Sequence, residues 1–262
     1  MPRKTVSGIH IAYDDIGEGL PIVFIHGFPL SRQIWRHQIK NLSKRWRIIA
    51  LDLPGFGKSG RPKEYSIKGF AESVVGLMRE IDAEPAILAG HSMGGYIIFE
   101  IVRRFPGSML SLILINTRAE ADTAEAKERR MKAIGKIRSE GKEAFLREFL
   151  PLLLAPKNRR KLLGELEKMC EDISEEALIG TLKTLAERPD NTELLPRIRI
   201  PTLIIAGRED PLIPPESSLT MARMIPKSAL AVISDTGHLS CLEAPNQFND
   251  TVSKFIMSLE RE

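Results

Sequence analysis

Cysteine is scarce in this chain, and its scarcity excludes a fold held together by disulfides. Only Cys170 and Cys241 occur in 262 residues, with no CxxC pair and no His/Cys cluster at the spacing of metal ligands. A chain without a disulfide framework is typical of a reducing compartment. We therefore expect no structural disulfides and no bound metal.

Long apolar runs are absent as well. The amino-terminal stretch MPRKTVSGIHIAYDDIG holds no apolar segment as long as that of a signal peptide. No run elsewhere approaches the length that a helix needs to span a bilayer. The sequence therefore predicts a soluble, cytoplasmic protein without a membrane span, and leaves export by another route open.

Neither sign of charge dominates the chain. It has 38 Lys and Arg against 34 Asp and Glu, a formal net charge of +4, and the two signs are interspersed. This pattern indicates a charged, solvated surface rather than a basic patch for nucleic acid. We expect no nucleic acid among the partners, and a homodimer remains open.

What the chain does contain is an alternation of short apolar runs and longer amphipathic segments. Continuous Ile, Leu and Val runs, typical of parallel strands buried on both faces, predict strands at 21–26, 47–52, 85–90, 109–116, 201–207 and 228–234. Helical spacing of apolar residues predicts helices at 31–44, 66–82, 94–105, 215–225 and 245–259. Residues 5–17 alternate more and predict an antiparallel edge hairpin. Together these segments predict an α/β fold with a mostly parallel sheet of about eight strands and helices on both faces.

Residues 118–195 break this alternation. They hold charged amphipathic helical patterns, with breaks at Gly141, Pro156 and Pro189, and no convincing strand. The segment predicts a helical cap inserted into a core domain made of residues 1–117 and 196–262. Apolar side chains within 142–155 should pack the cap onto the core, and some should line a pocket beneath it. The residues that we expect to line this pocket are Trp35, Phe145, Phe149 and Leu153.

The pentapeptide GHSMG at 90–94 joins a predicted strand to a predicted helix and has the form G-x-S-x-G. Its glycines permit a sharp turn that lifts the hydroxyl of Ser92 above the strand end, at the helix N-terminus. A base can approach the hydroxyl there, and the N–H of Met93 faces a developing oxyanion. The alternative is a glycine-rich turn without catalytic purpose, because short glycine patterns recur by chance.

A serine hydroxyl needs a base to take its proton, and the chain offers five histidines. His10 in the hairpin and His37 in the first helix are typical surface or packing residues. His26 shapes its own loop, and the side chain of His91 should point away from the serine beside it. His238 follows the last predicted strand, at the sheet edge where open α/β sheets bind ligands. We therefore expect His238 to be the base, although a solvent-exposed turn residue is the alternative.

The histidine needs a carboxylate to orient it, and Asp210 follows another predicted strand. Pro211 after it begins a fixed turn, which favours Asp210 over its neighbour Glu209. Asp235 is a local competitor that would otherwise make an Asx turn in its own loop. Asn116, at the end of a third strand, has no carboxylate to offer.

The order Ser92, Asp210, His238 matches the Ser…Asp…His order of the hydrolases that carry a nucleophile elbow. The second oxyanion donor should come from HGFP at 26–29, where Gly27 lets the chain turn and the N–H of Phe28 is available. The sequence therefore predicts a site for acyl transfer that needs neither a metal nor an organic cofactor.

These motifs together resemble the α/β-hydrolase superfamily. HGFP, DLPGFGKS (52–59), GHSMGG (90–95), GREDPLIP (207–214) and GHLSCLEAPNQFN (237–249) occur in that order over nearly the whole chain. The resemblance implies that Ser92 is the nucleophile, Asp210 the acid and His238 the base. It also implies an oxyanion hole made of the N–H groups of Phe28 and Met93.

Within that superfamily the chain looks like small carboxylesterases and enol-lactonases of aromatic catabolism, on its length and on NTRAEADTAEAKERR (116–130). Haloalkane dehalogenases and most epoxide hydrolases use an aspartate nucleophile, which Ser92 argues against. Carbon–carbon bond hydrolases usually carry Asn in place of His91. The resemblance implies a serine hydrolase of small to medium, mainly apolar carboxylic esters. A 3-oxoadipate enol-lactonase-like lactonase, a perhydrolase, a hydroxynitrile lyase and a ligand-binding receptor of the same fold remain alternatives.

Overall fold

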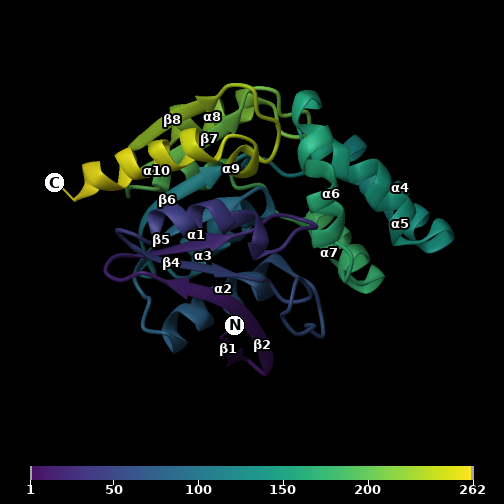
Figure 1. The fold of residues 1–262 in the computed structure, drawn as a ribbon, viewed down its shortest axis with the longest axis horizontal. Coiled ribbons are helices and arrows are strands. Elements are labelled where there is room, and N and C mark those ends of the chain that lie inside the picture. Colours follow the sequence, from purple (N-terminus) through teal and green to yellow (C-terminus); the bar gives the residue numbers. More distant parts are fainter. Residues whose placement is uncertain (1, 261–262) are drawn as a thin grey trace.

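The computed structural model describes residues 2–260, and its centre is an eight-stranded sheet (Figure 1). The strand order is β1-β2-β4-β3-β5-β6-β7-β8. The pairs β1–β2 and β2–β4 are antiparallel, and the remaining pairs are parallel. The strands are β1 (Arg3–Val6), β2 (Ile9–Ile16), β3 (Pro21–Ile25), β4 (Arg47–Leu51), β5 (Ala86–His91), β6 (Met109–Ile115), β7 (Thr202–Gly207) and β8 (Ser228–Ile233). The predicted mostly parallel sheet is confirmed.

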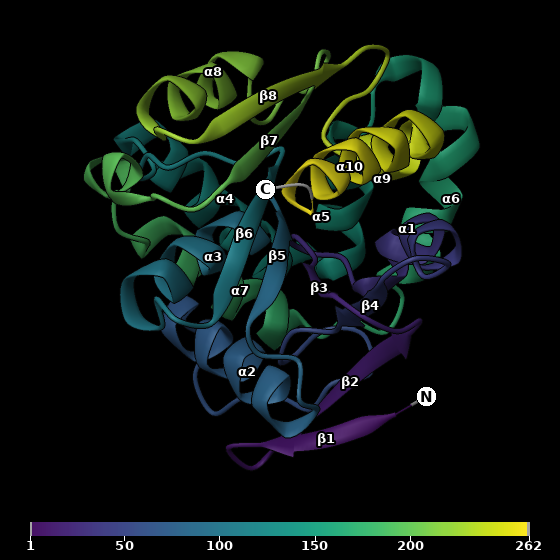
Figure 2. The same cartoon turned by 90° about the vertical axis from the view of Figure 1, so that its left-hand side faces the viewer.

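Helices cover both faces of this sheet. Figure 2 shows α2, α3 and α8 on one face and α1 and α10 on the other. These helices are α1 (Arg36–Leu42), α2 (Ile67–Glu80), α3 (Met93–Arg104), α8 (Pro215–Met224) and α10 (Pro245–Leu259), with the short α9 (Ser240–Glu243) before the last. The central strands β5 and β7 are buried along their whole length, as continuous apolar runs require.

The predicted start of α2 is confirmed in detail. Ser66 is its N-cap residue, and its hydroxyl accepts a hydrogen bond from the N–H of Gly69 at 3.0 Å. The predicted helix over 31–44 differs, because its first part is a 3-10 turn (Arg32–Trp35) and α1 follows it. Asp52 fixes that turn from outside the helix. Its carboxylate accepts from the backbone N–H of Arg32 at 2.8 Å and from the guanidinium of the same residue.

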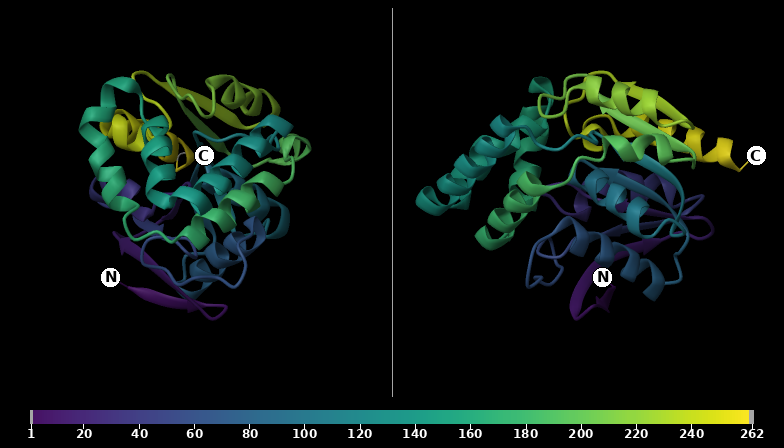
Figure 3. Two further views of the ribbon diagram at one scale, coloured as in Figure 1. Left: turned by 90° about the vertical axis from the view of Figure 1, so that its right-hand side faces the viewer. Right: turned by 180° about the vertical axis from the view of Figure 1, so that it is seen from behind.

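The chain between β6 and β7 forms four longer helices that gather beyond one end of the sheet (Figure 3). They are α4 (Ala124–Glu140), α5 (Lys142–Phe149), α6 (Arg159–Met169) and α7 (Glu175–Glu187). We call residues 118–195 the helical segment. Its description as a cap domain inserted into a core stays a prediction. Within residues 2–260, no helix combines the length and apolar character needed to cross a membrane.

A buried carboxylate, Asp122, connects the start of α4 to the end of α7. It accepts hydrogen bonds from the guanidinium groups of Arg118, Arg130 and Arg188. Burial alone would raise the pKa of Asp122, but Arg130 and Arg188 outweigh burial and lower it to about 2. The guanidinium of Arg188 also lies 4.2 Å from the ring centre of Tyr96 in α3. These contacts attach the helical segment to the helix that follows Ser92.

Helix α3 packs directly onto the sheet because two glycines leave room for it. A Cβ atom on Gly94 would lie 2.4 Å from the carbonyl oxygen of Ile25 in β3. A Cβ atom on Gly90 would lie 2.5 Å from the backbone of Gly94. Real Cβ atoms do not approach backbone atoms so closely, so any larger residue here must displace α3 from the sheet.

We expect Gly94→Ala to lower the free energy of unfolding by about 1–3 kcal/mol, because the added methyl group overlaps the backbone of Ile25. Gly164→Ala is the matched control at an exposed position of α6, where a Cβ atom meets nothing within 4 Å. The control should stabilise by about 0.5–1 kcal/mol through helix propensity. Urea unfolding followed by circular dichroism measures both. A Gly94→Ala midpoint at or above the wild-type value would contradict the packing described.

Candidate active site

Ser92 occupies the turn between β5 and α3 in a backbone conformation that non-glycine residues rarely adopt. Its φ is 51° and its ψ is −110°. Its N–H donates to the carbonyl oxygen of Ile115 at 2.9 Å. Its own carbonyl oxygen accepts from the N–H of Gly95 and from the hydroxyl of Thr117. The strained turn is therefore held on both sides by hydrogen bonds, as is typical of functional sites.

His238 and Asp210 come together from two different loops. The loop after β8 brings His238 to the carboxyl end of the sheet, where its Nδ1–H donates to Oδ2 of Asp210 at 2.7 Å. Both side chains are buried. In the neutral tautomer that carries its proton on Nδ1, Nε2 is the nitrogen able to accept a proton. The two residues that the sequence predicted as acid and base are thus in direct contact.

The carboxylate of Asp210 is saturated with hydrogen-bond donors. Oδ1 accepts from the backbone N–H groups of Leu212 and Ile213, at 2.9 and 3.0 Å. Oδ2 accepts from Nδ2 of Asn116 at 2.9 Å as well as from His238. Burial would raise the pKa of Asp210, but His238, the N–H of Ile213 and Asn116 together lower it. Asp210 is therefore ionised and fixed in orientation.

The other candidates for the orienting acid and the base lie away from the contact between Asp210 and His238. Asp235 is exposed and forms an ion pair with Lys157 at 2.6 Å, and Glu209 is exposed beside Asp210. His10 is exposed in β2 and bonds to the hydroxyl of Thr5, and His37 belongs to α1. None of these four side chains replaces Asp210 or His238 in the contact described.

The HGFP loop lies directly against the serine. A Cβ atom on Gly27 would stand 3.0 Å from Cβ of Ser92 and 2.5 Å from Nδ1 of His91, so only glycine fits. The buried side chain of His26 holds the loop through two hydrogen bonds. Its Nδ1–H donates to the carbonyl oxygen of Gly27 at 3.0 Å, and its Nε2 accepts from the N–H of Leu53 at 3.0 Å. Burial lowers the pKa of His26, which keeps this ring neutral.

His91 supports His238 rather than Ser92. Its Nε2–H donates to the backbone carbonyl oxygen of His238 at 2.7 Å, and the two ring centres lie 4.8 Å apart. Burial and then the neighbouring His238 lower the pKa of His91 to about 3. The Nδ1 atom of the buried ring has no hydrogen-bond partner among the described residues. A neutral ring with one donating nitrogen fits these surroundings.

Glu243 ties the loop of His238 to the helical segment. Its Oε1 accepts from the N–H groups of Gly237 at 2.8 Å and Leu239 at 3.2 Å, the two neighbours of His238. Its Oε2 accepts from the N–H of Ala155 and from the side chain of Asn158, both at 2.8 Å. Burial raises the pKa of Glu243 although these donors oppose the rise. The carboxylate is the common partner of both segments.

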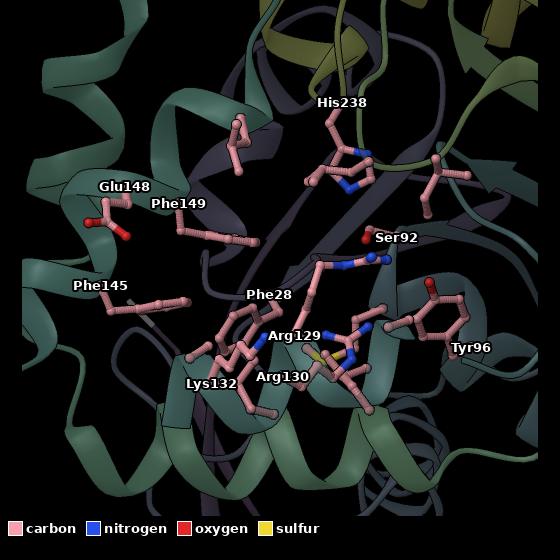
Figure 4. Close-up of a pocket in the computed structure, with 18 of the residues that line it drawn as sticks. Phe28, Ser92, Tyr96, Arg129, Arg130, Lys132, Phe145, Glu148, Phe149 and His238 are labelled. Atoms are coloured by element: carbon pink, nitrogen blue, oxygen red, sulfur yellow. The ribbon is translucent and has the colours of Figure 1, made fainter. Parts of the chain in front are cut away.

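Ser92 and His238 open into one cavity of about 490 Å³ between the sheet and the helical segment (Figure 4). Phe28 and Met93 line it beside them, as do the predicted pocket residues Phe145 and Phe149. Figure 4 shows the rings of Phe28, Phe145 and Phe149 on one side of the cavity. The remaining apolar lining is Tyr96, Ala126, Ala133, Leu152, Leu182, Leu185, Leu212 and Ile213.

Two predictions for the pocket are wrong. Trp35 is fully buried, with its ring centre 4.8 Å from that of Phe24 and 6.3 Å from that of Phe248, so it packs within the core. Leu153 is also fully buried and does not face the cavity, whereas its neighbour Leu152 does. Successive residues of a tight turn point in different directions, and an apolar run does not show which of them faces a cavity.

The cavity wall is less apolar than the sequence suggested. Five cationic side chains and one carboxylate contribute to it. They are Arg118, Arg129, Arg130, Lys132, Lys136 and Glu148. Within residues 2–260, no group of three or more His, Cys, Asp or Glu side chains is arranged to hold a metal ion.

The geometry agrees with a match to a known family. The family model described as alpha/beta hydrolase fold matches residues 21–245. The chain belongs to the α/β-hydrolase family. It is 31% identical to the AB hydrolase superfamily protein YisY of Bacillus subtilis (strain 168), over 96% of this chain and 97% of the relative. As a member of this family the chain is a hydrolase.

Two solved structures show how closely this α/β-hydrolase resembles characterised relatives. A malate-bound thermophilic esterase from Thermogutta terrifontis is 34% identical, with a TM-score of 0.92 over 98% of both chains. The enol-lactonase from Burkholderia xenovorans LB400 is 25% identical, with a TM-score of 0.90 over 98% of this chain and all of the other. Both superpose over the helical segment as well as the sheet, since nearly the whole chain is covered.

Sequence reasoning missed the roles of Asn116 and Glu243. Besides Asp210, Asn116 contacts Ser240, whose hydroxyl donates to Oδ1 of the amide at 2.7 Å. The sequence placed Asn116 at a strand end, which was a usable signal. Nothing comparable identified Glu243, because four donors from two separate stretches of chain converge on it only after folding.

The lowered pKa of His91 predicts that the protein loses stability in acid. An imidazole whose pKa falls from 6.5 to about 3 on folding stabilises the protein fully above pH 6.5. That contribution is lost at up to about 1.4 kcal/mol per pH unit as the pH falls from 6.5 toward 3. His91→Gln keeps a side-chain donor and cannot titrate, so the unfolding free energy should depend less steeply on pH between 6 and 4.

Urea unfolding at a series of pH values measures this dependence, with His10→Gln as the control that removes an exposed histidine. His26, which is also held neutral by burial, keeps part of the slope in every variant. A slope in His91→Gln equal to that of the wild type would contradict a neutral, buried His91.

Proposed function

We propose that this α/β-hydrolase is a serine hydrolase that cleaves carboxylic esters through an acyl-enzyme. The observation that carries the proposal is that Ser92 and His238 line one cavity while Nδ1 of His238 is hydrogen-bonded to Asp210. The helical segment would then serve as the cap that closes this cavity over a small or medium-sized ester. The site as proposed needs no metal and no organic cofactor.

The proposed mechanism follows from the position of each group. Nε2 of His238 takes the proton of the Ser92 hydroxyl while its oxygen attacks the ester carbonyl carbon. The N–H groups of Phe28 and Met93 stabilise the oxyanion, and the N–H at the first residue of α3 has no partner within its own helix. His238 then gives its proton to the leaving alcohol. Water, deprotonated by the same imidazole, hydrolyses the acyl-enzyme and restores Ser92.

Asp210 acts through His238. Its carboxylate fixes the Nδ1–H tautomer and stabilises the imidazolium that forms in each half of the reaction. Asn116 and two backbone N–H groups keep this carboxylate ionised and aimed at the ring. These contacts support the assignment of Asp210 rather than Asp235 as the orienting acid.

Lactone hydrolysis is the second candidate, because the structural relative from Burkholderia xenovorans is an enol-lactonase. The greater identity to the Thermogutta terrifontis esterase favours an open-chain ester. A lactone differs from an ester only in that its leaving alcohol stays attached to the acyl group, so the same residues would act on either. Rates on matched aryl esters and lactones separate the two.

We expect Ser92→Ala to fold like the wild type and to lose about three or more orders of magnitude in kcat for a p-nitrophenyl ester. The loss follows from removal of the attacking oxygen. Ser258→Ala, an exposed serine of α10, is the control and should retain full activity. Release of p-nitrophenolate, with circular dichroism as the test of folding, measures both variants. Undiminished turnover by folded Ser92→Ala would refute the nucleophile.

A further inference from the structure

We propose that this pocket takes esters that carry a carboxylate remote from the scissile bond, and that Arg129 of α4 binds this carboxylate. The inference rests on the proposed function, because it names the class of ester that the same site receives. It replaces the mainly apolar substrate expected from the sequence with an ester that is apolar near the reacting carbonyl and anionic at its far end.

Helix α4 presents an unusual face to the cavity. Its lining residues are Ala126, Arg129, Arg130, Lys132, Ala133 and Lys136, which recur at helical spacing along one side. A helix that covers a cavity over a hydrophobic core normally turns an apolar stripe inward. Here Ile134 and Ile137 are buried, and the adjoining cavity-lining face combines two small alanines with four cations. The alanines leave space between helix and sheet, and the cations surround that space.

Most of these cations already have acidic partners. Arg130 and Arg118, the fifth cation of the wall, both pair with Asp122 inside the buried cluster described above. Lys136 lies within ion-pair distance of both Glu140 and Glu148. Lys132 pairs with Glu128 at 2.8 Å, but both side chains of this pair are largely exposed, where solvent weakens the attraction.

Arg129 differs from the others. Among residues 2–260 no side chain forms a salt bridge or side-chain hydrogen bond with it, although Glu125 one turn earlier acts on it electrostatically. Figure 4 shows its side chain extending from α4 across the pocket, toward the side on which Ser92 lies. Arg129 is exposed, but among the described cations of the cavity wall it lacks a salt-bridge partner, so its guanidinium is available to a bound anion.

The chemistry of the guanidinium selects the anion. Its planar set of N–H donors matches the two oxygens of a carboxylate and forms paired, charge-assisted hydrogen bonds with it. Much of the remaining cavity wall is apolar and aromatic, with Phe28 and Tyr96 among its members. A chain of methylene groups suits such a wall. An acyl group with an apolar middle and a terminal carboxylate matches both parts.

Two p-nitrophenyl esters of equal acyl length test the proposal. One is p-nitrophenyl pentanoate, which is neutral, and the other is mono-p-nitrophenyl glutarate, which ends in a carboxylate. The quantity compared is the ratio of their kcat/KM values at low ionic strength. The variants are Arg129→Gln, Arg129→Lys and Lys127→Gln, the last a control that removes an exposed cation of the same helix outside the cavity.

We expect the wild type to favour the glutarate ester and Arg129→Gln to lower the ratio by about tenfold or more, as loss of a charged hydrogen-bond partner does. Arg129→Lys should give an intermediate ratio because it keeps the charge without the paired donors. Lys127→Gln should leave the ratio within about twofold of the wild type, since its charge lies outside the cavity. Added salt should reduce the wild-type preference.

A binding measurement separates this proposal from the proposed function. Calorimetric titration of Ser92→Ala and of Ser92→Ala/Arg129→Gln with each ester needs no turnover. If the wild type hydrolyses neither ester, ester hydrolysis fails as the function, while the titrations still show whether Arg129 selects the anion. Equal ratios in the wild type and Arg129→Gln, together with equal affinities of both esters in the titrations, would overturn the proposal. The cations would then offer the cavity only their methylene stems.

Discussion

The close approach of the loop after β3 to the turn between β5 and α3 is the constraint on which the site depends. Gly27, Gly90 and Gly94 each stand where a single added carbon would overlap backbone or side-chain atoms. Because these three positions carry no side chain, α3 can begin directly beside the HGFP loop. The strained backbone of Ser92 is a consequence of that contact, since the chain must reverse within one residue to enter the helix.

The sequence was sufficient for the fold and for bringing Ser92, Asp210 and His238 to one place, while their catalytic roles stay predictions. Buried parallel strands leave continuous apolar runs, so their positions were predicted to within one residue. The carboxyl ends of such strands lie at the same edge of the sheet, which is why residues far apart in the chain could be assigned to one place. The loop contacts of Asp210 with His238 then depend on local turn geometry that Pro211 and Gly237 signal.

The sequence was insufficient wherever the direction of a side chain decides its role. Trp35 and Leu153 are apolar residues near the site, but core packing competes with the pocket for such side chains and won in both cases. The cations of α4 have the spacing of a solvated helix, and nothing local distinguishes a solvated face from one that lines a cavity. Asn116 gains its role from partners distant in sequence, and Glu243 gains part of its role from Ala155 and Asn158, so the local sequence pattern does not reveal either.

The carboxylate of Glu243 makes the loop of His238 and the helical segment mechanically dependent on each other. Any displacement of residues 155–158 that leaves the Glu243 side chain in place must break its bonds to Ala155 and Asn158. A displacement that carries the Glu243 side chain along must instead break its hydrogen bonds to the backbone N–H groups of Gly237 and Leu239, on either side of His238. Leaving such groups unpaired in a partly buried site costs about 1–3 kcal/mol each. Movement of residues 155–158 apart from the His238 loop therefore carries this cost, whereas movement of the two together does not.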